Sequence, residues 1–115
     1  MQQFNNLPCN LTLSDPINKS NLYISRIAVM ISQCARCYVT DQELTNDNAE
    51  IHHRTPRQFG GGDVVANLVY LEKRVHHLIH TDSSREYIIR LAQLNLNEMQ
   101  IRKVDQLMYE IHSRV

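Results

Sequence analysis

Two short segments with the composition of β-strands, followed at once by a helix-forming segment, constrain the fold of this chain most strongly. Residues 49–54 and 67–72 have the length of strands, and the second contains the strand-forming run at 68–71. Three consecutive glycines fall in the connection between them. Residues 73–80 contain no glycine or proline, and their apolar positions suit one buried helix face. The order of these segments predicts a β-hairpin that leads directly into a helix.

The chain before this centre predicts an arm, a helix and a loop. Residues 1–20 mix asparagine, proline and serine with scattered apolar residues, so we expect an irregular arm. Residues 21–33 carry apolar residues at helical spacing after Ser20, which can act as the N-cap. Residues 34–48 combine a Cys-x-x-Cys turn with a polar stretch and predict a turn and a loop. Beyond the arm, residues 21–115 have the size of a single domain.

Two further helices are predicted near the C-terminus. Ser83 followed by Glu86 has the pattern of a capping box, and the apolar residues after it continue to about residue 94. Asn97 followed by Gln100 marks another helix start, and an apolar stripe follows it. We therefore expect an α+β fold, in which one N-terminal helix and two C-terminal helices flank a central hairpin and helix.

Charge and hydropathy limit the classes of partner. The chain has 12 basic and 12 acidic residues and a formal net charge of zero, unlike most autonomous DNA-binding proteins. Bulk charge therefore does not drive its binding. No apolar run has the length of a membrane span, and the N-terminus lacks the basic start and apolar core of a secretory signal. We expect a cytoplasmic protein that does not associate with a membrane.

The clustering of histidines points to a metal site. Residues four apart on a helix have Cβ atoms about 5–6 Å apart, so His76 and His80 can face one ion. His52, on the facing strand, can add a third ligand. Imidazole suits Zn, Ni or Cu and tolerates harder ions at open sites. Three ligands leave positions free for water and a phosphate oxygen, which is the arrangement that a hydrolytic site requires.

The other histidines of the cluster have different expected roles. His53 is next to a ligand, and an unperturbed pKa of about 6.5 suits a general base at neutral pH. His77 lies about 100° around the helix from His76 and cannot easily share its ion, so we expect contact with solvent or phosphate. A histidine pair or a His-x-x-x-His motif alone more often lies on the surface or in the core without binding a metal. Their combination in strand-to-helix order favours a metal site.

Residues 37–80 resemble the HNH endonuclease domain, also called the ββα-metal fold. Over residues 27–108 the chain is also similar to the C-terminal endonuclease domain of group II intron-encoded maturases. The motifs that carry this similarity are AEIHH at 49–53, GGG at 60–62, NLV at 67–69, VHHLIH at 75–80 and LNLN at 94–97.

The resemblance implies a function and roles for individual residues. It implies hydrolysis of DNA phosphodiester bonds with one divalent ion (Mg, Mn, Zn or Ni), bound by His52, His76 and His80, and with His53 as the base. Asn67 would pin the hairpin through backbone hydrogen bonds. Glu50 would orient a ligand or the base, although an exposed strand carboxylate is the alternative. Four basic residues flank the site and are expected to contact DNA phosphates: Arg54, Arg57, Lys73 and Arg74.

The chain departs from the cysteine-bearing members of the family. Glu72 and Val75 stand where those members often have a second Cys-x-x-Cys. The chain has only Cys9, Cys34 and Cys37, an odd set that argues against a disulfide framework and leaves free thiols or a partial metal site. Cys34 and Cys37 could still hold zinc with other ligands.

Two competing functions follow from the same residues. A non-catalytic zinc module that docks on nucleic acid or protein would use the Cys pair with two histidines, and it would leave His53 without a role. A zinc peptidase needs a glutamate directly after the first helix histidine, where this chain has His77. A larger targeting protein or ribonucleoprotein is a possible further partner, because the reverse transcriptase and intron-binding regions of the maturases are absent. The sequence leaves open whether the chain is a free-standing enzyme or a maturase remnant.

Overall fold

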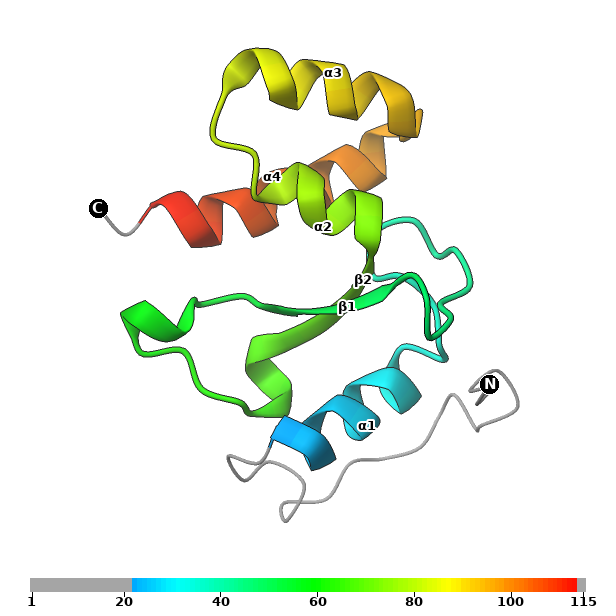
Figure 1. The fold of residues 1–115 in the computed structure, drawn as a ribbon, viewed down its shortest axis with the longest axis vertical. Helices are drawn as coiled ribbons and strands as arrows, with labels where there is room; N and C mark the ends of the chain where they lie inside the picture. The colour runs from blue at the N-terminus through cyan, green and yellow to red at the C-terminus, as the bar shows by residue number, and fades with distance from the viewer. Residues whose placement is uncertain (1–21, 114–115) are drawn as a thin grey trace.

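Four α-helices and a two-stranded antiparallel hairpin make up the part of the chain that the structure describes, residues 22–113 of a computed structural model (Figure 1). In chain order the elements are α1 (Leu22–Ser32), β1 (Ala49–His53), the 3₁₀ helices η2 (Arg57–Phe59) and η3 (Val65–Asn67), β2 (Leu68–Glu72), α2 (Lys73–Ile79), α3 (Ser84–Leu94) and α4 (Glu98–His112). The expected α+β class is confirmed. None of these helices is both long and apolar enough to cross a membrane. The predicted arm at 1–20 lies outside the described residues.

The hairpin and α2 form the centre of the fold. β1 pairs with β2 in a register that places Ala49 opposite Glu72 and His53 opposite Leu68. α2 begins at the residue that follows β2, so no loop separates the strand from the helix. Figure 1 shows α1 on one side of the hairpin and the three other helices on the opposite side. This order is compatible with a ββα arrangement.

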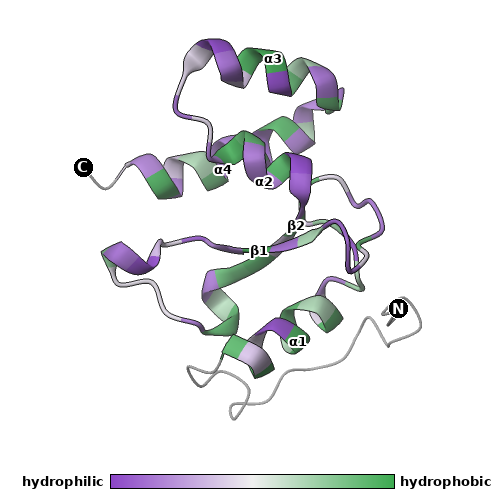
Figure 2. Ribbon diagram, in the orientation of Figure 1, coloured by the Kyte–Doolittle hydropathy of each residue, from purple (hydrophilic) through white to green (hydrophobic). Residues whose placement is uncertain are grey.

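Burial on both sides of the hairpin holds α2 in place. Every residue of β2 is buried, because α1 packs on one side of the strand and α2 on the other. Figure 2 shows the hydrophobic colouring that runs along β2. Leu78 of α2 and Leu107 of α4 are fully buried in the same core. Burying one such side chain contributes about 1.5–3 kcal/mol. The core therefore holds the helix that carries His76 and ends just before His80.

The segment before β1 consists of turns and a loop, as expected, but it also contributes to the core. Its apolar side chains are part of the core: Ala35, Cys37, Val39 and Leu44. Arg36 and Glu43 form an isolated antiparallel bridge, and the backbone reverses through positive φ angles at Cys34, Ala35 and Asp41. The sequence signal was the alternation of apolar residues at 35, 37 and 39, which the polar residues that follow obscured.

Asn67 ties together the connection between the two strands. Its Oδ1 accepts from the Thr55 amide at 2.8 Å, and its Nδ2 donates to the carbonyls of Thr55 at 3.1 Å and Gly62 at 3.0 Å. These bonds join the end of β1 to the start of β2 across the glycine segment. The C-terminal helices begin at the expected caps, since Ser83 accepts from the Glu86 amide and Asn97 and Gln100 form a capping box.

The close approach at Gly61 gives a stability prediction. A Cβ at Gly61 would overlap the Thr55 carbonyl oxygen and lie 2.9 Å from Nδ2 of Asn67, whereas a Cβ at Gly62 meets no atom within 4 Å. We expect Gly61→Ala to lower the free energy of unfolding by about 1–3 kcal/mol, because the crowding displaces the Asn67 bonds. Gly62→Ala should leave it unchanged or raise it by up to about 1 kcal/mol. Urea denaturation of both variants tests this, and equal midpoints would contradict it.

Candidate metal centre

Three histidines from β1 and α2 converge on one point. His52, His76 and His80 each offer one ring nitrogen, and these nitrogens lie within 4.8 Å of one another. The ring centroids are 4.8–5.4 Å apart, with edge-to-face geometry. Nitrogens bound tetrahedrally to one zinc ion lie about 3.4 Å apart, so small rotations of the three rings would bring them to binding distance. The triad is positioned closely enough to bind a metal ion, and the ion's identity is not fixed by this geometry.

The buried nitrogen of His52 lacks a hydrogen-bond partner. The residue is 2% exposed. Within residues 22–113, its Nε2 is the one fully buried side-chain nitrogen or oxygen that makes no hydrogen bond. Leaving such an atom unsatisfied costs about 1–3 kcal/mol. A metal ion at the triad would supply the missing partner. The residues present therefore fit a metal ion.

Burial keeps His52 and His80 in the form that binds metals. Burial lowers the pKa of His52 to about 3, with further lowering by His76 and His80. Burial also lowers the pKa of His80, with further lowering by His76 and His112. Both imidazoles are therefore neutral at neutral pH and have a lone pair to donate to a metal ion.

Glu50 supports the triad from the same strand as His52. Its Oε1 lies 2.8 Å from Nδ1 of His76. Because a carboxylate accepts hydrogen bonds, Nδ1 carries the proton and Nε2 of His76 has the free lone pair. Glu50 and His52 are two residues apart on β1, so both side chains leave the same face of the strand, toward α2. Of the two expectations for Glu50, the structure shows the contact with a triad histidine.

His53 lies in a separate group of contacts. It is the last residue of β1 and directly follows His52 of the triad. Its Nε2 lies 2.7 Å from Oδ1 of Asp63, and an Arg57 nitrogen donates to the same carboxylate oxygen at 3.0 Å. The hydrogen bond from His53 lowers the pKa of the Asp63 carboxyl, with a smaller contribution from Arg57. Sequence reasoning missed Asp63, although it is the only acidic residue between the two strands.

The four basic residues expected to contact phosphates have different environments. Arg54 points away to α4, where its Nε donates to Glu110 at 3.1 Å and its guanidinium lies over the Tyr38 ring. Its contact with DNA phosphates stays a prediction. Arg57 pairs with Asp63, and Arg74 donates to both carboxylate oxygens of Glu72. Lys73 is exposed at the start of α2.

The two cysteines of the Cys-x-x-Cys turn do not form a zinc site in the part of the chain described. Cys34 is disulfide-bonded and is not the expected free thiol. Cys37 is buried, and its Sγ accepts from the Glu72 amide at 3.4 Å. Within residues 22–113, the histidine triad is the group of three potential ligands that the structure brings together. A zinc site at Cys34 and Cys37 therefore has no structural support.

No family model, curated protein or solved structure matches this chain. The candidate metal centre is therefore supported by the geometry of its three histidines alone. The resemblance to HNH endonucleases stays a prediction from the motifs.

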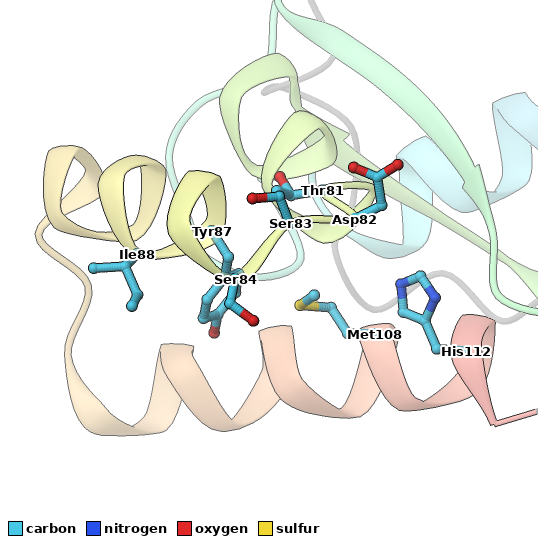
Figure 3. Close-up of a pocket in the computed structure, with 8 residues that line it drawn as sticks. All are labelled: Thr81, Asp82, Ser83, Ser84, Tyr87, Ile88, Met108 and His112. Atoms are coloured by element: carbon cyan, nitrogen blue, oxygen red, sulfur yellow. The ribbon is translucent and has the colours of Figure 1, made fainter.

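A cavity of about 550 Å³ lies beyond α2, between the start of α3 and α4. Figure 3 shows Met108 and His112 directed from α4 toward the segment that connects α2 to α3. Thr81 and Asp82, directly after His80 in the chain, form part of the lining.

Proposed function

We propose that this chain is a metal-dependent endonuclease of the HNH type that hydrolyses DNA phosphodiester bonds. The observation that carries the proposal is the convergence of His52, His76 and His80. One of the converging residues, His52, has a buried Nε2 without a hydrogen-bond partner. The neighbouring His53, which is outside the triad, supplies a base beside it. The HNH-like motifs support the choice of reaction.

The number of ligands favours catalysis over a structural role. Structural zinc sites are usually closed by four protein ligands, whereas catalytic sites usually have three and keep a position open. In the described part of the chain, the triad offers three ligands. Its exposure increases from His52, which is buried, to His80, which is exposed, so one side of the site is open to solvent. A phosphate can approach from that side.

The chain's residues divide the chemistry between them. A divalent ion bound by the triad supplies Lewis-acid stabilisation of the scissile phosphate and of the departing 3′-oxygen. Glu50 fixes the orientation of His76. His53 accepts the proton of the attacking water, and Arg57 and Lys73 contact the DNA backbone. The products carry 5′-phosphate and 3′-hydroxyl ends.

The charge of the chain bears on how it finds DNA. With a net charge of zero and few basic residues at the site, the isolated chain binds DNA weakly and in a salt-sensitive manner. Targeting to a particular sequence then comes from a larger protein or ribonucleoprotein partner.

Cleavage of supercoiled plasmid by the purified chain, with Mg, Mn, Ni or Zn added singly after chelation, tests the proposed function. We expect conversion to nicked and then linear plasmid with at least one metal, and none with chelator alone. His53→Ala, purified in the same way, controls for contaminating nucleases. If the chain binds a metal but cuts no DNA with any of the four, the proposal is wrong and a non-catalytic metal module becomes the better interpretation.

A further inference from the structure

The contacts of His53 determine which of its ring nitrogens carries the proton. Nε2 lies 2.7 Å from Asp63 Oδ1 and 3.4 Å from Arg57 Nε. These two contacts make opposite demands, because a carboxylate requires a donor and a guanidinium nitrogen requires an acceptor. The carboxylate contact is much shorter and lies in the range of strong charge-assisted hydrogen bonds. Nε2 therefore carries the proton, and the longer contact with Arg57 is the weaker of the two.

Protonation of Nε2 leaves the lone pair of the neutral ring on Nδ1. Within residues 22–113, Nδ1 of His53 makes no hydrogen bond. This nitrogen is also not fully buried. The nitrogen that can accept a proton is therefore open to a water molecule. Without a partner at Nε2, a neutral imidazole populates both tautomers, and only one of them presents the lone pair at Nδ1.

The Asp63 carboxylate is held in place by anchors on both sides. The Ser25 hydroxyl, on a fully buried residue of α1, donates to the Asp63 carbonyl at 2.6 Å. Asn67 donates to the carbonyl of the preceding Gly62 at 3.0 Å. Arg57 donates to the carboxylate itself. Three elements thus fix a residue that lies in the irregular connection between the strands, and such fixing is needed for a residue that orients a base.

We infer that Asp63 is a positioning residue that holds His53 in the Nε2-protonated tautomer and directs Nδ1 to the attacking water. This inference rests on the proposed function, because it assigns Asp63 a task only if His53 is the base. A carboxylate that fixes the tautomer and orientation of a catalytic histidine acts through that histidine and does not touch the substrate. Arg57 assists by keeping the carboxylate in place.

The experiment compares the parent with Asp63→Ala, and uses Asp47→Ala as a control that removes an exposed acid outside this group. Two-bond ¹H–¹⁵N correlation spectra at about pH 8 report the tautomer of His53 directly. We expect the Nε2-protonated form in the parent and Asp47→Ala, and a mixture in Asp63→Ala. We also expect Asp63→Ala to lower kcat by about 10- to 100-fold, with KM for DNA and metal affinity within about twofold of the parent.

The outcomes separate this inference from the proposed function. A parent His53 protonated at Nδ1, or a tautomer that does not change in Asp63→Ala, overturns the positioning role. A changed tautomer with undiminished kcat also overturns it, while the proposed function stands. A parent that cuts no DNA overturns the proposed function and, with it, the role of Asp63, even if the tautomer shifts as expected.

Discussion

His53→Ala is expected to lower the rate of DNA cleavage by about 10²–10⁴-fold while metal affinity stays unchanged, because the variant removes a positioned proton acceptor and no ligand. The two functions are separable because the two side chains have different partners: His52 joins the triad, and His53 contacts Asp63. His80→Ala should lower metal affinity and cleavage together. Metal titration calorimetry beside a plasmid-nicking assay, in one buffer, measures both effects.

His77→Ala provides the matched control for these variants. His77 is exposed on α2, one residue from His76, and is not part of the triad. We expect its cleavage rate and its metal affinity to remain close to those of the parent. The assignment of roles is wrong if His53→Ala cuts normally, or if it loses metal binding as completely as His80→Ala.

Metal binding should raise the melting temperature of the parent strongly, and His52→Leu should abolish this increase without destabilising the metal-free protein. At a free metal concentration 100 times Kd, binding stabilises a fold by about 2.7 kcal/mol, which corresponds to about 10–20 °C for a domain of this size. Without metal, the parent buries an unsatisfied Nε2 at His52. Leucine of similar size removes that polar atom, so the metal-free variant should be as stable as the parent or more stable.

We would measure thermal melts of the parent, His52→Leu and His77→Leu, each with chelator and with added Zn or Ni. These melts test both the metal-induced increase and the stability of the metal-free protein. His77→Leu should retain the metal-induced increase. A large metal-induced increase in His52→Leu would show that the ion binds elsewhere. A metal-free His52→Leu much less stable than the parent would show that Nε2 is satisfied by a partner other than a metal.

Much of the centre of this protein is predictable from the sequence. The two strands, α2 and the starts of α3 and α4 agree with their predicted bounds to within one residue. The convergence of His76 and His80 was also predictable. The reason is that strand alternation, helix periodicity and capping depend on residues only a few positions apart, whose relative directions are set once the local backbone is known. The HNH-like function remains a prediction from these motifs.

Tertiary structure alone decided the contacts between distant residues. Arg54 pairs with Glu110, 56 residues further along the chain, and no local pattern pointed to this partner. Asp63 contacts His53 in a connection whose backbone is anchored by Ser25, 38 residues away in α1. Such partners depend on how helices and strands pack, and neither periodicity nor residue type encodes which distant side chain will lie within hydrogen-bonding distance. The sequence therefore determined the ligands of the candidate site, and packing determined what holds and orients them.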